Sequence, residues 1–241
     1  TAGWSGKQQV FDRSRMGNET SFGLGFSGNE MIGKFVAGND FNYVQAHATS
    51  IAASGKYNIS SCSSEVIASG RVQMKNYQAV DLINGLERHD GYTHAYFKSF
   101  TPALQNSIRQ YASQGGRILI SGSYTGSDMQ TEEEQAFLSD ILKLSYEPTG
   151  STAITRDINP EDSTVTERDS IVYTSPNVKG LGLQFSYYNE LNAQHYAATH
   201  PEILKPVGNY AFTAMQYDTG TSAAVAYKST TYRSFVMGFP L

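Results

Sequence analysis

The segment Gly122-Ser123-Tyr124-Thr125-Gly126 has the spacing of a nucleophile elbow, in which small residues let a sharp strand-to-helix turn project one side chain. The Gly-x-X-x-Gly frame places Tyr124 at the nucleophile position, and Ser123 would take that position if the turn shifted by one residue. A phenol, with a pKa of about 10, is a poor acyl-transfer nucleophile without activation. We therefore interpret the segment as a tight turn that joins a strand to a helix.

Candidate bases for such an elbow lie in residues 84–94, where Glu87, His89 and His94 follow an apolar segment. A base must lie within hydrogen-bond reach, about 3 Å, of the nucleophile that it activates. Together with Asp90 these residues have metal-ligand chemistry, but their spacing fits no zinc motif, and we expect no metal and no cofactor.

Two further segments resemble motifs of known enzyme classes. His200-Pro201-Glu202 resembles the His-Pro-Glu of glutamine amidotransferases, but about forty residues follow it, so we interpret His200 as a surface histidine before a helix-starting proline. Asp218-Thr219-Gly220-Thr221 matches the aspartic-protease signature, which needs a second copy that the chain lacks. We predict a hairpin turn there, and a polar loop rather than a calcium site in the acidic segment 157–169.

The elements that would position these residues alternate between strand and helix. Residues 79–83 and 117–121 read as buried strands, and Thr101 with Pro102 marks the start of the clearest helix. Thr131 and Glu134 form a capping box before another helix. This alternation predicts an α/β fold of the flavodoxin-like kind, in which a parallel sheet carries helices on both faces.

Outside that stretch the predicted pattern is less regular. We expect a strand at 31–37, a helix at 41–54 and a strand at 57–62, and mainly strands and turns after residue 151. Residues 211–217 and 222–227 predict an additional C-terminal β-hairpin region, followed by a last strand at 232–238. Residues 1–30 read as a linker from a preceding domain, and 31–241 as a single domain truncated at its C-terminus.

Ligands of open parallel sheets bind beyond the carboxyl ends of the strands. We therefore assign Gly85, Gly122, Gly126 and Asp128 to a substrate pocket, since they follow the strands at 79–83 and 117–121.

Composition narrows the class of protein. Hydrophobic residues make up 39% of the 241 residues and charged residues 17%, which suits a folded domain. No basic cluster is interleaved with aromatic residues, and no apolar run could span a bilayer, so we expect neither a nucleic-acid partner nor a membrane span. The single Cys62 excludes an internal disulfide and a cysteine-based metal cluster.

Several separated blocks carry a family resemblance: residues 78–85, 100–116, 117–128, 223–227 and 235–240. They resemble the flavodoxin-like, class I glutamine amidotransferase-like domain of large secreted bacterial proteins labelled xanthan lyase. The resemblance implies a secreted or cell-envelope location, association with polysaccharide and other domains in the same chain. Tyr124 stands where that family pattern has its cysteine, and Gly238-Phe239-Pro240 stands roughly where its histidine motif would end the sheet.

Three hypotheses about function follow. The first is a non-catalytic or degenerate amidotransferase-like module of a polysaccharide-associated protein. The second is an active hydrolase or lyase on extracellular glycan or peptidoglycan, using Ser123 or Tyr124 with Glu87, His89 or His94. The third is sugar binding by stacking on exposed aromatic side chains: Tyr92, Tyr96, Tyr124, Tyr187 and Tyr188.

Overall fold

A computed structural model describes residues 43–85, 87, 98–158, 165–189, 198 and 200–241. Its largest element is a seven-stranded sheet in the order β1-β2-β11-β10-β9-β6-β7. The strands of this sheet are β1 (Val80–Gly85), β2 (Arg117–Gly122), β6 (Asn177–Gly180), β7 (Leu183–Ser186), β9 (Ala211–Tyr217), β10 (Ser222–Lys228) and β11 (Arg233–Met237).

The helical segments are short. They are α2 (Tyr43–Ala53), α3 (Ser64–Ala68), the 3-10 turn η3 (Met74–Asn76), α4 (Pro102–Ser113), α5 (Glu132–Phe137) and its π-helical continuation η4 (Leu138–Leu142). The described residues also contain two small sheets. In one, β3 (Leu144–Glu147) pairs with β8 (Ile203–Pro206), and in the other, β4 (Thr152–Ile158) pairs with β5 (Val165–Ile171).

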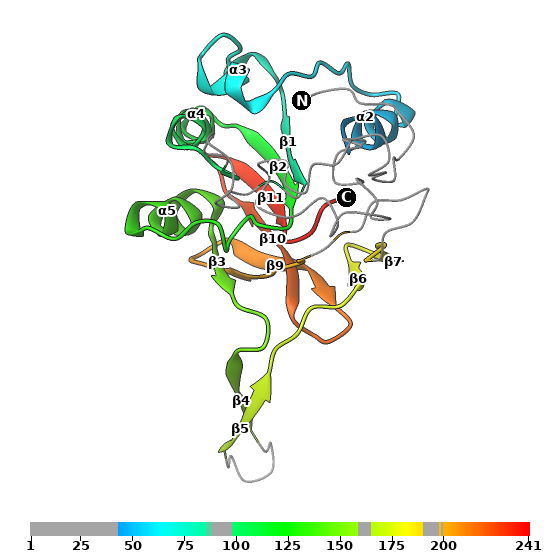
Figure 1. Cartoon of the computed structure of the whole chain (residues 1–241), viewed down its shortest axis with the longest axis vertical. Coiled ribbons are helices and arrows are strands. Elements are labelled where there is room, and N and C mark those ends of the chain that lie inside the picture. Colours follow the sequence, from blue (N-terminus) through cyan, green and yellow to red (C-terminus); the bar gives the residue numbers. More distant parts are fainter. Residues whose placement is uncertain (1–42, 86, 88–97, 159–164, 190–197, 199) are drawn as a thin grey trace, which may run out of the picture.

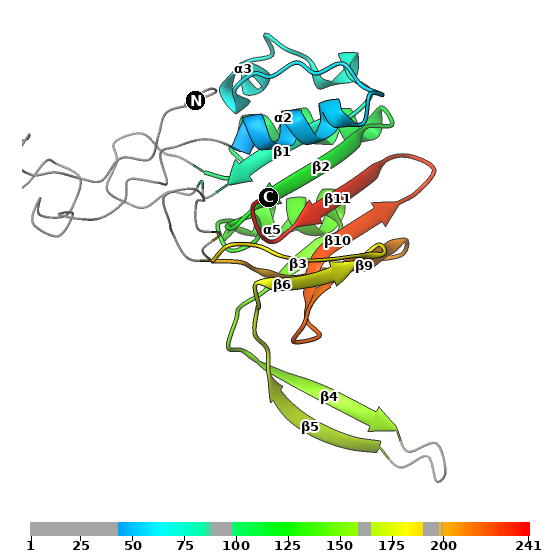
Figure 2. The same cartoon turned by 90° about the vertical axis from the view of Figure 1, so that its right-hand side faces the viewer.

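The flavodoxin-like prediction is wrong, because the sheet is mixed. Only β1, β2 and β11 are parallel, while β10, β9, β6 and β7 continue the sheet through antiparallel pairs. Between β3 and β11 the described residues contain no helix that could carry the chain back across the sheet, and strands joined by short turns must run antiparallel. The sheet also curls, so that β9 and β6 lie turned from the direction of β1 and β2 (Figure 2).

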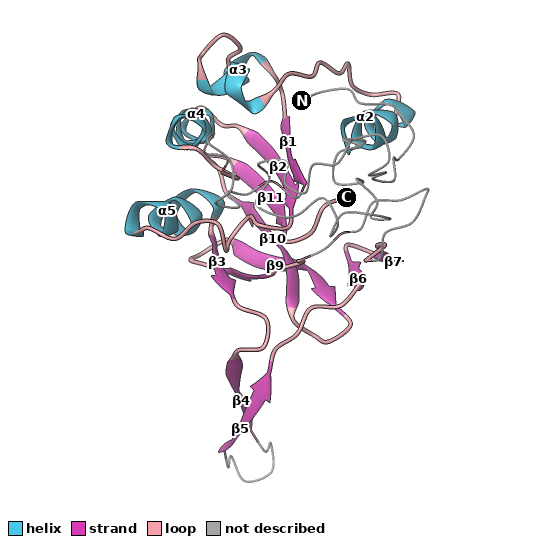
Figure 3. Cartoon of the chain, viewed as in Figure 1, coloured by secondary structure: helices cyan, strands magenta, loops and turns pink. Residues whose placement is uncertain are grey.

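The distribution of helices also differs from the prediction. Helices α3, α4 and α5 cover one face of the sheet, and α2 lies by itself against the other face at β1 (Figure 1). Colouring by secondary structure shows how much of the described chain is strand and loop (Figure 3). The predicted C-terminal hairpin exists as β9 and β10, but it forms the middle of the sheet rather than an addition to it.

Local sequence signals account for the helices that were predicted well. Thr101 caps α4 by accepting a hydrogen bond from the Leu104 N–H, and Pro102 occupies the first turn. The capping box of α5 is confirmed, because Thr131 accepts from the Glu134 N–H and the Glu134 carboxylate accepts from the Thr131 N–H. That carboxylate also binds the buried Lys98 ammonium.

Other local predictions fail. Residues 57–62 are irregular rather than a strand. Of the predicted polar loop at 157–169, residues 157–158 and 165–169 belong to the paired strands β4 and β5, and residues 159–164 lie outside the described residues. These two strands project from the rest of the described chain as an arm (Figure 2). The predicted strand at 31–37 and the linker at 1–30 lie outside the described residues.

Two apolar cores lie on the two faces of the large sheet. The core under α3, α4 and α5 includes Ile108, Ile120 and Phe137, all fully buried. The core on the α2 side includes Met237, Tyr217 and Phe239. On the α2 side, no helix of the described residues packs along the whole sheet. Some apolar side chains of that face, such as Leu119 and Phe235, are therefore only half-buried.

Candidate functional site

The parallel strands β1, β2 and β11 end at one edge of the sheet. We call this edge the rim, and its described residues are 84, 85, 87, 122–128, 200–202 and 238–239. The predicted pocket residues Gly85, Gly122, Gly126 and Asp128 all lie there or directly beside it. The Ser123 N–H donates to the Gly85 carbonyl at 2.8 Å, which ties the loop after β2 to the end of β1. Gly122 has no room for a side chain, because a Cβ would lie 2.7 Å from the Asn84 Cβ.

The elbow segment 122–126 is closed rather than projecting. Ser123 and Thr125 are fully buried, and Tyr124 is only 9% exposed. The Thr125 hydroxyl donates back to the Gly122 carbonyl at 3.2 Å. A nucleophile elbow works by holding its side chain out toward substrate, so this segment is a packed turn.

Glu202, which directly precedes β8, connects several parts of the rim. Its carboxylate accepts hydrogen bonds from the backbone N–H groups of Gly126 at 2.6 Å and Ser127 at 2.9 Å. The Glu202 N–H donates to the Gly238 carbonyl at 2.6 Å, and the Glu202 carbonyl accepts from the Tyr217 hydroxyl at 2.8 Å. One buried acidic residue therefore joins the loop after β2 to the ends of β11 and β9.

His200 lies at the same rim, which the sequence argument did not predict. Its imidazole contacts the Tyr124 ring, with ring centroids 5.3 Å apart, and it is exposed. Its backbone is in the left-handed region, with φ at 56°. Strand β8, not a helix, follows Pro201, so the interpretation of His200 as a residue before a helix start is wrong.

The position of the His-Pro-Glu motif explains this error. The motif does not end the last strand of the chain, but the contact between Glu202 and Gly238 places it beside the end of that strand. Distance along the sequence was therefore a poor guide to distance in space. The motif itself was the signal that could have found both His200 and Glu202.

Glu87 is the only one of the predicted bases among the described residues, since His89 and His94 lie outside them. Its carbonyl accepts from the Ser99 hydroxyl at 3.0 Å, and the Ser99 N–H in turn donates to the Asp128 carboxylate at 2.8 Å. Burial, with the nearby Glu65 carboxylate, raises the pKa of Glu87 to about 7. Because His89 and His94 lie outside the described residues, the pairing of Ser123 or Tyr124 with a base stays a prediction.

Burial also raises the pKa of Glu202 to about 7, with the Asp128 charge acting in the same direction and the hydrogen bonds from Ser127 and Gly126 opposing it. Buried carboxyls with raised pKa values gather at functional sites, but they also occur in structural networks. Because both Glu202 oxygens accept backbone hydrogen bonds, the second explanation fits Glu202 better.

The raised pKa of Glu202 predicts how stability depends on pH. A carboxyl whose pKa is higher in the folded state binds its proton more tightly there, so its contribution is full below the unfolded value of 4.5 and is lost as pH rises through about 7. We expect the free energy of unfolding to fall by about 2 kcal/mol between pH 5 and 7 through this group. Urea unfolding of wild type and Glu202→Gln across this range measures the difference in slope. The exposed-carboxyl variant Glu133→Gln is the control, and equal slopes for wild type and Glu202→Gln would contradict the prediction.

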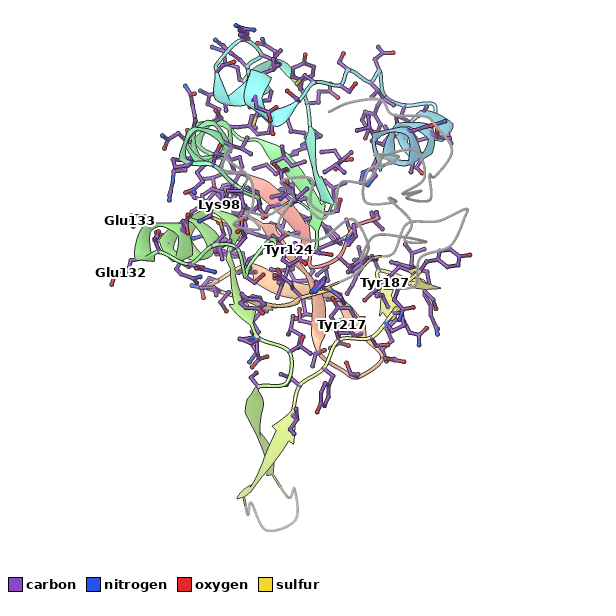
Figure 4. All side chains as sticks on the ribbon, in the orientation of Figure 1. Lys98, Tyr124, Glu132, Glu133, Tyr187 and Tyr217 are labelled. Carbon is purple, nitrogen blue, oxygen red and sulfur yellow. The ribbon has the colours of Figure 1, made fainter. Side chains whose placement is uncertain are left out.

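The aromatic side chains predicted to stack on sugars divide into three groups. Tyr92 and Tyr96 lie outside the described residues. Tyr124 is buried against His200, and Tyr187 is packed on Phe239 with ring centroids 5.1 Å apart. Figure 4 shows Tyr124 near the middle of the molecule and Tyr187 on the side of β6 and β7. Tyr188 is 58% exposed, and its carbonyl accepts from the Ala198 N–H at 2.7 Å, which places it near the segment that leads to His200.

The described residues confirm the predicted hairpin turn. Segment 218–221 is the turn of the β9–β10 hairpin, where the Gly220 N–H donates to the Tyr217 carbonyl at 2.9 Å. No three His, Cys, Asp or Glu side chains in the described part of the chain gather closely enough to hold a metal ion. No helix among the described residues has the length and apolar character needed to cross a bilayer.

Comparison with known proteins adds no family assignment, because no protein-family model matches this chain and no curated protein matches it significantly.

Proposed function

We propose that this chain is a non-catalytic module of a secreted, multidomain protein associated with polysaccharide, and that it contacts glycan at the rim. The observation that carries the proposal is the closed elbow, in which Ser123 is fully buried and Tyr124 is only 9% exposed. A nucleophile elbow must present its side chain to the substrate. Glu202 holds the loop in this closed form, because the Gly126 and Ser127 N–H groups donate to its carboxylate.

Support for glycan contact comes from two exposed rings: His200 at the rim, and Tyr188, whose carbonyl accepts a hydrogen bond from the Ala198 N–H. Tyr188 and His200 are exposed, and planar rings are suited to the apolar faces of sugars because they offer a large rigid surface at little entropic cost. The resemblance to secreted proteins labelled xanthan lyase supports a polysaccharide as the partner. We therefore propose that these two rings form the contact surface.

Affinity electrophoresis against a panel of bacterial polysaccharides tests this function. We expect wild type to be retarded by at least one polymer, and Tyr188→Ala and His200→Ala each to weaken the interaction about fivefold, since such ring contacts contribute about 0.5–1.5 kcal/mol. Tyr57→Ala is a matched control, because Tyr57 is also 58% exposed and lies between α2 and α3. The proposal would be contradicted if no polymer retarded the wild type, or if Tyr57→Ala weakened the interaction as much as the other two variants.

A second candidate is an active hydrolase or lyase on extracellular glycan or peptidoglycan. The contact between Tyr124 and His200 favours it, since a phenol beside an imidazole can pass a proton. We propose as its test the release of reducing ends or of unsaturated products from the same polymers. Activity that disappears in both Tyr124→Phe and His200→Gln would replace the non-catalytic proposal, and unchanged polymer would exclude this candidate for that panel.

A further inference from the structure

A histidine and an aspartate pair beneath α2, on the face of the sheet opposite α3, α4 and α5. The His47 Nδ1 and the Asp81 Oδ2 lie 2.7 Å apart and join α2 to β1, which lie next to each other in Figure 1. His47 is 8% exposed and is the only buried side chain among residues 44–53 of this helix. Most helices dock through an apolar stripe, so a helix that buries a polar side chain instead requires an explanation.

The pairing fixes which nitrogen of His47 can accept a hydrogen bond. A carboxylate on Nδ1 favours the tautomer that carries its proton there, and this leaves a lone pair on Nε2. Yet Nε2 is enclosed and has no hydrogen-bond partner, and the same is true of the second Asp81 oxygen, Oδ1. Leaving such atoms unsatisfied costs about 1–3 kcal/mol each, and buried polar atoms in folded proteins rarely lack partners.

A third enclosed atom without a partner lies on the same face. The Ser121 hydroxyl is fully buried on β2, where Ser121 is paired with Ile83, two residues along β1 from Asp81. Alternate residues of a strand lie on the same face, so Asp81, Ile83 and Ser121 share the face that α2 covers. Half of the enclosed unpartnered side-chain atoms in the described chain thus come from one region: His47 Nε2, Asp81 Oδ1 and Ser121 Oγ.

These three atoms select a particular kind of ligand. A neutral His47 Nε2 and the Asp81 oxygen both require a hydrogen-bond donor, while the serine hydroxyl can donate or accept. A metal ion does not fit, because the described residues offer no group of three metal-ligating side chains. A hydroxyl group fits, since its oxygen both donates and accepts.

We propose that His47, Asp81 and Ser121 form a polar binding site beneath α2 that holds a hydroxyl-bearing molecule, either an enclosed water or a saccharide. Helix α2 covers the site through His47 itself, so the ligand contributes to the docking of the helix. Asp81 lies near the end of β1 that is opposite to the rim, whereas Ser121 directly precedes the rim residue Gly122, so the site extends along the sheet up to the rim.

Nuclear magnetic resonance of the full chain labelled with ¹⁵N-histidine tests the site directly. The chain has only five histidines, so the spectrum of His47→Gln assigns the His47 signals. We expect a proton on Nδ1, a hydrogen-bonded lone pair on Nε2, and cross-peaks from the His47 ring protons to a long-lived water. Saccharides that shift these signals saturably and remove the water cross-peaks would identify a sugar as the occupant, whereas unchanged cross-peaks would identify water.

Variants separate this site from a merely structural histidine. Asp81→Asn replaces the carboxylate by a neutral amide, whose oxygen is a weaker acceptor for a proton on Nδ1. We therefore expect a larger share of His47 to carry its proton on Nε2 and the bound hydroxyl to exchange faster. Ser121→Ala is expected to shorten the lifetime of the bound water at least tenfold. Ser234→Ala is the matched control, because the Ser234 hydroxyl is also enclosed without a partner but lies on β11. A wild-type His47 with its proton on Nε2, or ring protons that contact neither water nor saccharide, would overturn the proposal.

Discussion

Replacing Glu202 by alanine is expected to lower the free energy of unfolding by about 3–5 kcal/mol. The substitution leaves the Gly126 and Ser127 N–H groups without their acceptor, and each buried donor left unpaired costs about 1–3 kcal/mol. A cavity at a residue that is only 4% exposed adds to the loss. Urea unfolding followed by tyrosine fluorescence and far-ultraviolet circular dichroism measures the change.

The control for this experiment is Glu147→Ala. Glu147 binds Lys205 across the small β3–β8 sheet, and the Lys205 side chain is half exposed. An ion pair of this kind contributes about 1 kcal/mol or less. A loss for Glu202→Ala no greater than that of the control would show that the carboxylate does not hold the rim together.

Gly238→Ala is expected to be comparably damaging, with a loss of at least about 3 kcal/mol in the free energy of unfolding. A Cβ at this position would lie 2.4 Å from the Glu202 carbonyl oxygen, a backbone atom that cannot rotate away. The same two residues share the hydrogen bond from the Glu202 N–H to the Gly238 carbonyl, so separating them breaks this bond too. Thermal unfolding by calorimetry measures the effect.

Gly220→Ala provides the comparison for Gly238→Ala. Gly220 has φ at +88° and no atom within 4 Å of its added Cβ, so its substitution reports only the backbone cost of a left-handed residue, about 1–2 kcal/mol. We expect Gly238→Ala to be clearly worse. If the two variants have the same melting temperature, the contact between Gly238 and the Glu202 carbonyl is not tight.

Sequence patterns predicted the elements whose signals are local. The start of α4 at Thr101 and Pro102 and the capping box of α5 depend on residues within one helical turn, and both are present. The β9–β10 turn at 218–221 is likewise a short-range signal. Strand direction is different, because it depends on how the chain returns to the sheet. The strand–helix alternation before residue 151 did not indicate that the later strands join the same sheet through antiparallel pairs.

The candidate site was predicted only in part, because some of its residues are brought together by neighbouring strands and others by distant parts of the sequence. Gly85, Gly122 and Gly126 are together at the rim because β1 and β2 are parallel neighbours, which two adjacent apolar segments could indicate. Glu202 could not be placed in that way, because it reaches Gly126 across 76 residues of sequence. Its contacts depend on β8 pairing with β3, and nothing in the composition of either strand specifies that partner.

The arm of β4 and β5 leaves and rejoins the rest of the chain at a single point. The Gly150 N–H donates to the Val172 carbonyl at 2.7 Å, and the Val172 N–H donates to the Ser151 carbonyl at 3.1 Å, so the two ends of the arm are fastened to each other. We therefore expect that shortening, lengthening or exchanging residues 152–171 would leave the path of the flanking backbone unchanged. This makes the arm the natural place for evolution, or for a protein engineer, to graft a new recognition element without rebuilding the sheet.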